Sequence, residues 1–328
     1  MKSLVRIALI IAAVCQSCRG GEVTTERGET TSGLDGERQP LLYWAPESAA
    51  KESTPMLVFL HSWSSDYRQD NSKWLNACAT RNWIWLHPNF RGINQTPNAC
   101  GSRYARQDVL DAVAFAKKRW NVNPNRIYLA GVSGGGHMAL LMAGHHPDQF
   151  SGVSAWVGPT DLAEWHRFHT QNGTPGKYAL MIEKSLGGPP GISPAIDADY
   201  RDRSPVFHLS NVGDLPVSIW TGVEDGHSGS VPIRHSLAAF NVIAESHGDT
   251  AITAGEITEL SELKRLKSPH KSDLERDAAL PKSILLRRHT GESMLTVFDG
   301  GHESHPDVAL EWLNVKRRAV ADAEASSR

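Results

Sequence analysis

The sequence has no strong excess of either charge. Its formal net charge is -2, and its lysines and arginines are scattered along the chain. A protein that binds nucleic acid or an anionic membrane surface gathers basic residues on one face. We therefore expect no nucleic-acid partner and no polybasic membrane contact, and the binding partner is predicted to be a small or neutral molecule.

A long apolar run is also missing. The apolar stretch from Ile7 to Val14 follows Lys2 and Arg6 and is shorter than the roughly 20 residues that span a bilayer. Such a stretch is typical of an export signal. We expect residues 1–20 to be a signal segment of a secreted or periplasmic protein, with a lipid anchor at Cys18 as an alternative and no stable membrane span. The polar residues 21–40 predict a disordered lead-in, and 321–328 a frayed tail.

Cysteine is scarce, with four residues in the chain. Removal of the signal segment leaves Cys78 and Cys100. Because an exported protein meets an oxidising compartment, we predict a disulfide between them, with two buried free thiols as the alternative.

Recognisable metal and cofactor motifs are missing as well. The chain has fifteen histidines, but "HESH" at 302–305 lacks the HExxH spacing, and "HRFH" at 166–169 has no carboxylate in a recognisable frame. No P-loop or dinucleotide fingerprint is present. We predict neither a metal nor a cofactor.

Short apolar runs recur along the chain, and most are followed by a helical pattern. This alternation predicts an α/β fold with a mostly parallel central sheet flanked by helices. The domain is expected over 41–320, with a small cap inserted at about 160–203 and a peripheral excursion at about 248–290. The predicted strands are Met56–Leu60, Trp83–Leu86, Arg126–Val132, Gly152–Val157, Val217–Trp220 and Met294–Phe298.

One stretch, "RIYLAGVSGGGHMALL" at 126–141, places Ser133 between glycines where a strand pattern changes to a helix pattern. Gly131, Ser133 and Gly135 match Gly-x-Ser-x-Gly, in which a sharp strand-to-helix turn exposes a nucleophilic serine. A structural glycine turn is the alternative.

A serine nucleophile needs a base and an acid that orients the base. On this fold the order is serine, acid, histidine. The loop "VSIWTGVEDGHSGSVP" supplies Asp225, with Glu224 as its rival, and "LTVFDGGHESHP" supplies His302, with His305 as its rival. His227 is less favoured because its loop already provides the acid.

The developing oxyanion needs two N–H donors. The amide of Gly134 follows the nucleophile and is predicted to be one of them. The second is expected from Trp63 or Ser62 in "VFLHSWSSDY". Trp63, Trp156 and Trp220 fall at or near strand ends, where indole rings line a pocket for a sugar ring or an acyl group; core packing is the alternative for each.

The motifs "GVSGGGHMAL", "RSPVFHL", "GVEDGHSGSVPIRHS" and "FDGGH" together resemble the catalytic domain of the prolyl oligopeptidase (S9) branch of the α/β-hydrolases, over roughly residues 41–320 apart from the two insertions. The resemblance implies the triad Ser133, Asp225 and His302. These peptidases usually carry a β-propeller that filters substrates, and the present sequence leaves no room for one.

We therefore expect a secreted serine hydrolase that works through an acyl-enzyme. Stand-alone domains of this type are often similar to secreted esterases, so an esterase acting on small acyl or carbohydrate esters is favoured. A prolyl oligopeptidase-like peptidase is the first alternative, and a non-catalytic binding protein on the same fold is the second.

Overall fold

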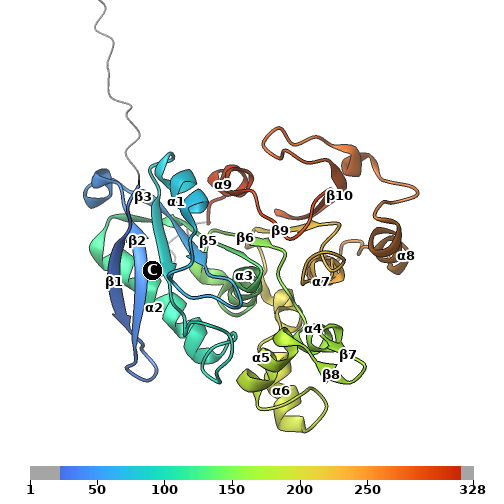
Figure 1. Cartoon of the computed structure of the whole chain (residues 1–328). Helices are drawn as coiled ribbons and strands as arrows, with labels where there is room; N and C mark the ends of the chain where they lie inside the picture. The colour runs from blue at the N-terminus through green and yellow to red at the C-terminus, as the bar shows by residue number, and fades with distance from the viewer. Residues whose placement is uncertain (1–22, 319–328) are drawn as a thin grey trace, which may run out of the picture.

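One mixed sheet of nine strands organises the protein in a computed structural model that describes residues 23–318 (Figure 1). Its spatial order is β1-β2-β4-β3-β5-β6-β9-β11-β10. The pairs from β4 through β11 are parallel, whereas the two edges are antiparallel. The strands are β1 Glu26–Thr31, β2 Arg38–Trp44, β3 Thr54–Leu60, β4 Ile84–Pro88, β5 Val122–Val132, β6 Gly152–Trp156, β9 Val217–Gly222, β10 Ile284–Thr290 and β11 Ser293–Phe298.

Helices cover both faces of this sheet. Buried side chains of α2, α3 and α7 join one apolar cluster, and those of α1 and α9 join another on the opposite face. The predicted α/β class with a mostly parallel, helix-flanked sheet is therefore confirmed. These helices are α1 Ser72–Ala79, α2 Arg103–Arg119, α3 Gly134–His145, α7 Arg234–Ser246 and α9 Pro306–Asn314.

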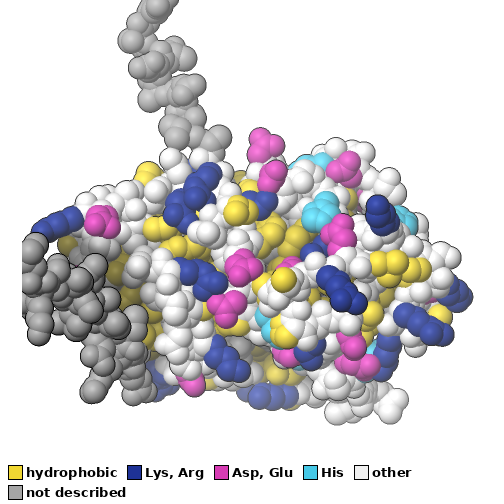
Figure 2. All heavy atoms as spheres, turned by 90° about the horizontal axis from the view of Figure 1, so that it is seen from above, with side chains coloured by type: hydrophobic (Ala, Val, Ile, Leu, Met, Phe, Trp, Pro, Cys, Tyr) yellow, Lys and Arg dark blue, Asp and Glu magenta, His cyan; other side chains and the backbone are white. Residues whose placement is uncertain are grey.

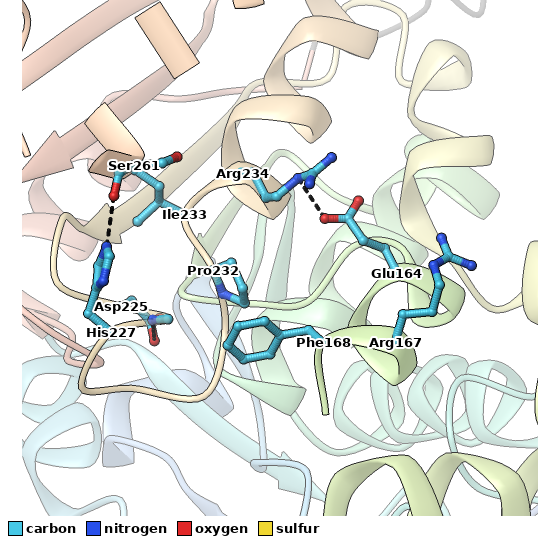
Figure 3. Close-up of a pocket in the computed structure, with 10 residues that line it drawn as sticks. Glu164, Arg167, Phe168, Asp225, His227, Pro232, Ile233, Arg234 and Ser261 are labelled. Atoms are coloured by element: carbon cyan, nitrogen blue, oxygen red, sulfur yellow. Dashed lines mark hydrogen bonds and ion pairs between the residues drawn. The ribbon is translucent and has the colours of Figure 1, made fainter. Parts of the chain in front are cut away.

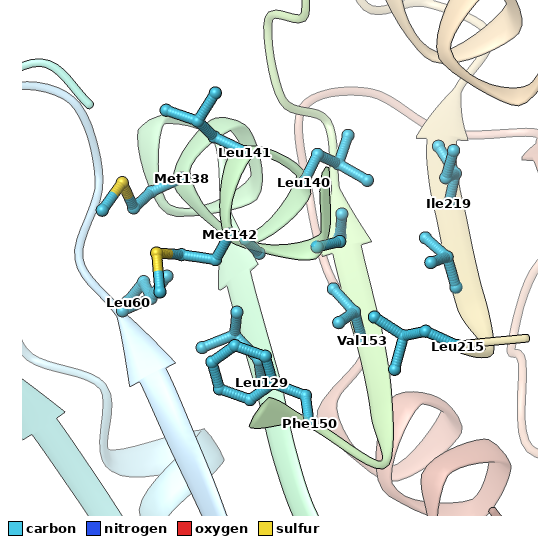
Figure 4. Packing of buried hydrophobic residues seen from close by; sticks show 14 of the residues in the cluster. Leu60, Leu129, Met138, Leu140, Leu141, Met142, Phe150, Val153, Leu215 and Ile219 are labelled. Atoms are coloured by element: carbon cyan, nitrogen blue, oxygen red, sulfur yellow. The ribbon is translucent and has the colours of Figure 1, made fainter. Parts of the chain in front are cut away.

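The helix that follows Ser133 lies at the centre of the larger cluster. Met138, Leu140, Leu141 and Met142 of α3 pack over the central strands (Figure 4). Every residue of α3 from Gly134 to Gly144 is buried, because the sheet covers one side and the segment that includes His208 covers another. Burial of so much apolar surface is the main stabilising term for this layer, and it fixes the start of α3.

The expectation of a disordered lead-in over 21–40 is wrong for the residues that form the β1–β2 hairpin. Residues Glu26–Thr31 pair antiparallel with Arg38–Tyr43. The hairpin tip is held by Arg91, whose buried guanidinium bonds Asp35 at 2.8 Å and Asp108 of α2 at 2.6 Å. The segment is polar because it forms a sheet edge, and its order comes from these tertiary ion pairs.

The chain between β6 and β9 forms a helical cap. It contains α4 Leu162–Phe168, the short strands β7 Thr170–Gln171 and β8 Thr174–Pro175, α5 Lys177–Leu186 and α6 Pro194–Asp202. These elements gather on one side of the sheet layer (Figure 1). They share a third apolar cluster with Trp63 and Cys100, so the cap packs directly on the loops that follow β3 and β4.

The excursion at 248–290 is only partly peripheral. It begins with α8 Ala254–Thr258 and a π-helical turn Glu259–Leu263. Residues Ile284–Thr290, however, return as the edge strand β10, antiparallel to β11. The alternation of this strand was hidden by Arg287 and Arg288, which bond Asp277 and Asp273 within the same segment.

The expected signal segment 1–20, Cys18 and the tail 321–328 lie outside the described residues, and export stays a prediction. No helix within 23–318 is long and apolar enough to cross a membrane. On the face drawn in Figure 2, basic and acidic side chains are interspersed. This distribution agrees with the low net charge.

The predicted disulfide is not formed, and both thiols are free and buried. Cys78 lies on α1 in the cluster beneath one face of the sheet, whereas Cys100 belongs to the cap cluster. Burial raises the pKa of Cys78 well above its usual range and that of Cys100 to about 12. Two different packing layers therefore separate the cysteines.

Both thiols should resist modification in the folded protein, because only the thiolate reacts and burial suppresses it. Alkylation followed by peptide mapping should label Cys78 and Cys100 only after denaturation without reductant. A disulfide-linked pair of peptides from native protein would contradict this arrangement.

Candidate active site

Ser133 occupies a strained turn between β5 and α3. Its backbone has φ 59° and ψ -118°, a left-handed conformation that costs a non-glycine residue energy and that recurs at functional sites. A Cβ at Gly131 would overlap the backbone of Gly135, so the elbow closes only with glycine there. The strand–turn–helix context predicted for Ser133 is present.

The ends of four parallel strands lie together at this edge of the sheet. The Ser133 amide donates to the Trp156 carbonyl at 2.8 Å, and the Val157 amide donates to the Trp220 carbonyl at 2.8 Å. The Val223 amide donates to the Phe298 carbonyl at 2.9 Å. These bonds continue the strand pairing of β5, β6, β9 and β11 past the strand ends. The loops that carry Ser133, Asp225 and His302 therefore leave the sheet at one edge.

Asp225 and His302 are in direct contact. The distance between His302 Nδ1 and Asp225 Oδ2 is 2.7 Å, and the Asp225 side chain is fully buried. The other carboxylate oxygen accepts hydrogen bonds from the amides of Gly226 at 3.0 Å and Val231 at 3.1 Å. Residues 223–233, here named the acid loop, thus fold around their own carboxylate and compensate its charge.

The alternative residues Glu224, His227 and His305 make other contacts. Glu224 forms an ion pair with Lys264, and His227 Nε2 lies 2.8 Å from the Ser261 carbonyl. His305 Nε2 is buried without a hydrogen-bond partner in the described part of the chain, and its ring packs against Trp156 and Phe298. The geometry therefore pairs Asp225 with His302, and none of Glu224, His227 and His305 takes part in this contact.

The backbone of Trp63 lies against Gly134, the residue that follows Ser133. An ideal Cβ on Gly134 would overlap the backbone nitrogen of Trp63, so the two peptide groups are neighbours. The Ser62 amide donates to Gln69 Oε1 at 2.8 Å, whereas the Trp63 amide has no acceptor within residues 23–318. The structure thus favours Trp63 over Ser62 as the second donor and adds Gln69, which sequence patterns did not single out.

The structure does not join Ser133 to His302 by a hydrogen bond within the described residues. Such bonds are often long in ligand-free enzymes. Ser133 itself is half-buried, and the His302 side chain is about 25% exposed. Both side chains therefore remain accessible from the loop edge.

The predicted pocket tryptophans are core residues, so that expectation is wrong. Trp156 and Trp220 are both 0% exposed, and their rings stack with centroids 4.8 Å apart. They come from adjacent strands in register, on the face that α9 covers. Trp63 is also buried, packed edge-on against Trp165 of the cap. The position of a tryptophan near a strand end does not predict whether its ring packs in the core or faces the site.

A cleft does lie beside the acid loop, but α4 rather than the tryptophans forms its other wall. Its volume is about 420 Å³, and its lining includes Phe168, Arg167 and Asp225 (Figure 3). The acid loop is tied to α4 because Trp165 Nε1 donates to the Ser230 carbonyl at 2.7 Å, and His169 Nε2 lies 2.9 Å from the same oxygen. The i, i+4 spacing places these two aromatic side chains on one face of the helix, but it does not by itself indicate a contact with the acid loop.

Three side chains among the described residues offer metal-ligand atoms within 4.8 Å of one another, namely His145, Asp202 and His208. The Asp202 carboxylate is bound by Arg106 at 3.0 Å. His208 Nε2 and His145 Nε2 face the Asp202 carbonyl at 3.0 and 3.3 Å. The two imidazoles thus bond the free carbonyl at the end of α6, and the guanidinium opposes a cation there.

Comparison with known proteins adds the family. The sequence profile of the "Prolyl oligopeptidase family" matches residues 101–253, which include Ser133 and Asp225. The matched region thus belongs to a catalytic α/β-hydrolase domain of the prolyl oligopeptidase family. The resemblance predicted from the sequence is confirmed, and the domain is a serine hydrolase of the S9 type.

This chain matches only part of the length of its relatives and of the solved structures that resemble it. "Acylamino-acid-releasing enzyme 1" of Oryza sativa subsp. japonica is 25% identical over 216 residues, 60% of this chain and 26% of that protein. "Acetylxylan esterase" of Coprinopsis cinerea is 36% identical over 50 residues, 15% of this chain and 13% of that protein. The acylaminoacyl peptidase of Pyrococcus horikoshii matches in fold with a TM-score of 0.59 and 16% identity, over 88% of this chain and 40% of that chain.

Gly229→Ala should impair activity while the protein stays folded. Gly229 lies over the acid, and a Cβ there would overlap Asp225 Oδ1 and approach His302 Cβ to 2.9 Å. Displacement of the pair by about 1 Å should lower kcat by about tenfold to a hundredfold. Gly255→Ala is the matched control, because its nearest neighbour atom is 3.9 Å away. Equal kcat values for the two variants would contradict this role of the acid loop.

Stability should fall as the pH drops below about 6.5. Burial lowers the pKa of His137 to about 4 and those of His235 and His87 to about 3, from an ordinary 6.5. Between these values the unfolded chain binds protons that the folded protein excludes, so the unfolding free energy decreases by about 1 kcal/mol per pH unit for each histidine.

Urea unfolding followed by tryptophan fluorescence at about pH 7 and about pH 5 measures this effect. His137→Asn should reduce the pH dependence, because an amide can still donate to the Arg203 carbonyl that His137 Nε2 meets at 2.8 Å but does not titrate. Stability that is constant over this range would show that these histidines are not excluded from protonation.

Proposed function

We propose that this serine hydrolase cleaves carboxylic esters through an acyl-enzyme on Ser133. The observation that carries the proposal is the 2.7 Å contact between His302 and the fully buried Asp225, at the same sheet edge as the strained Ser133 elbow. A binding protein has no need for a buried acid aimed at an accessible histidine. This pairing therefore argues against the non-catalytic alternative.

The proposed mechanism begins with transfer of the Ser133 hydroxyl proton to His302 Nε2 while Oγ attacks the ester carbonyl carbon. Asp225 accepts the Nδ1–H of His302, which leaves Nε2 as the basic nitrogen and stabilises the imidazolium that forms. The amides of Gly134 and Trp63 donate to the tetrahedral oxyanion.

Collapse of the tetrahedral intermediate breaks the ester C–O bond. His302 returns the proton to the departing alkoxide, which leaves as an alcohol and leaves Ser133 acylated. Water then enters, loses a proton to His302 and attacks the acyl carbon. The carboxylic acid departs and the proton returns to Ser133, so the cycle consumes one water and needs no cofactor.

Esters are favoured over amides as substrates on chemical grounds. An alkoxide leaves a tetrahedral intermediate more readily than an amine, which must be protonated as it departs, so a triad without extensive substrate positioning handles esters first. The local similarity to an acetylxylan esterase supports this choice. Amide cleavage is the alternative, supported by the longer similarity to an acylamino-acid-releasing enzyme.

A substrate panel tests the proposal. We expect kcat/KM to be higher for short-chain acyl esters and for acetylated or methyl-esterified oligosaccharides than for acylamino-acid amides and proline-containing peptides. Ser133→Ala should lower the rate by about a thousandfold or more and abolish labelling by a fluorophosphonate. Efficient peptide cleavage with negligible ester hydrolysis would replace the esterase by a peptidase, and labelling of the Ser133→Ala protein would remove Ser133 as nucleophile.

A further inference from the structure

The main chain on both sides of the Trp63 amide is held by hydrogen bonds. The Ser62 carbonyl, which belongs to the same peptide group as that amide, accepts from the Ser65 amide at 3.2 Å, and His61 Nδ1 lies 3.1 Å from the same oxygen. The Trp63 carbonyl accepts from the Asn94 amide at 3.0 Å. In a trans peptide the N–H points away from the C=O. The contacts of the Ser62 carbonyl therefore set the direction of the Trp63 N–H.

Ser62 is also held through its own amide, by a row of three side chains. The Ser62 amide donates to Gln69 Oε1 at 2.8 Å, and Gln69 Nε2 donates to Asn71 Oδ1 at 3.1 Å. Asn71 Nδ2 lies 3.1 Å from Nε2 of His87. His87 Nδ1 lies 2.6 Å from the Phe59 carbonyl. The side chains of Gln69, Asn71 and His87, here named the polar bridge, thus tie the loop after β3 back to the end of β3.

The main-chain groups at its two ends determine the direction of the hydrogen bonds in the polar bridge. The Phe59 carbonyl only accepts, so Nδ1 of His87 carries a proton. His87 is fully buried, and burial lowers its pKa to about 3. The ring is therefore neutral, and its Nε2 accepts from Asn71. The Ser62 amide at the other end only donates, and the two side-chain amides between these ends each supply one donor and one acceptor.

Asn71 takes part in the polar bridge instead of a local contact. It is the N-cap residue of α1, where an asparagine side chain ordinarily accepts from an amide of the first helical turn. Its side chain forms no such bond and meets Gln69 and His87 instead. The tertiary contacts of Asn71 therefore prevail over the local one.

We propose that the polar bridge positions the oxyanion hole. It engages the amide of Ser62 and leaves that of Trp63 as the donor beside Gly134. A donor lowers the barrier most when it already points at the place where the oxyanion forms. The members of the bridge are positioning residues, because they act through Trp63. The proposal rests on the proposed acyl-enzyme function, since the donors serve its tetrahedral intermediates.

The rate of labelling by a fluorophosphonate tests the proposal without a natural substrate. When Ser133 attacks phosphorus, the phosphonyl oxygen takes the place of the oxyanion, so the rate depends on the same donors. Gln69→Ala should slow labelling by about tenfold to a hundredfold, as for a catalytic group misplaced by about 1 Å. Asn71→Ser should slow it less, because serine still caps the helix and Gln69 still accepts from Ser62.

Gln69→Glu separates the direction of the hydrogen bonds from simple packing. An ionised carboxylate accepts from the Ser62 amide but has no proton to donate to Asn71 Oδ1. If Asn71 turns its amide over, its oxygen meets the unprotonated Nε2 of His87. A protonated carboxyl group, in contrast, has one donor and one acceptor, as the glutamine amide has toward these two neighbours.

Labelling of this variant should therefore be slow at about pH 7, and the ratio of its rate to that of the unmodified protein should rise toward about pH 5 as the carboxylate gains a proton. The same ratio for Gln69→Ala should stay constant. Protonation of His302 slows all the proteins alike and cancels in the ratio. So do the other titratable and charged groups close to the bridge, which are His61, Asp66, Arg68 and Asp70.

Gln107→Ala is the matched control. Gln107 is also half-buried, and its side-chain amide also donates a hydrogen bond, to Asp111 of its own helix at 2.9 Å. This variant should be labelled at the rate of the unmodified protein. Urea unfolding checks that each variant is folded, and Gln69→Glu, which keeps the side-chain volume, carries the test if Gln69→Ala does not fold.

Two results would overturn the proposal: unchanged labelling rates in both Gln69→Ala and Asn71→Ser, or a ratio for Gln69→Glu that does not rise as the pH falls. A protein that is labelled at Ser133 but hydrolyses no ester would refute the esterase function and leave the role of the bridge intact. Failure of the unmodified protein to react would remove Ser133 as the nucleophile, and the catalytic role of the bridge with it.

Discussion

Parallel pairing of the central strands is the constraint on which the site depends. Because β5, β6, β9 and β11 run in one direction, the loops after them emerge at one edge. Hydrogen bonds between the strand ends, such as the one from Val223 to Phe298, keep the loops in register. Asp225 and His302 lie 77 positions apart in the chain and meet only because of this register.

The acid loop turns that proximity into a defined geometry. A buried carboxylate is costly unless donors surround it, and Asp225 receives one from His302 and two from its own loop. The acid is thereby fixed in one orientation, and the histidine is fixed with it. Packing of α3 beneath Ser133 has the same effect on the opposite partner, since a helix buried on all sides cannot shift without loss of apolar contacts.

The cap connects substrate selection to this geometry. Trp165 and His169 bond the Ser230 carbonyl of the acid loop, while Arg167 and Phe168 on the same helix face the cleft outside that loop. A group that fills the cleft therefore contacts the segment that orients Asp225. This chain matches less than half of the length of the larger relatives.

The sequence by itself determined the features that rest on local periodicity and on short motifs. Buried parallel strands are continuous apolar runs, so β3, β5, β6, β9 and β11 were visible, and the elbow glycines identified Ser133 because only small residues fit so tight a turn. The order serine, acid, histidine then indicated the loops that carry Asp225 and His302, but left Glu224 and His305 as alternatives until the structure showed the contact between Asp225 and His302.

Only the tertiary structure decided what depends on which residues meet across the fold. Ion pairs from Arg91 order the polar β1–β2 hairpin, different packing layers keep Cys78 and Cys100 apart, and sheet register buries Trp156 against Trp220. The choice of Trp63 over Ser62 depends on a bond to Gln69. None of these contacts has a signature in local sequence, because each is set by the packing of segments that are distant along the chain.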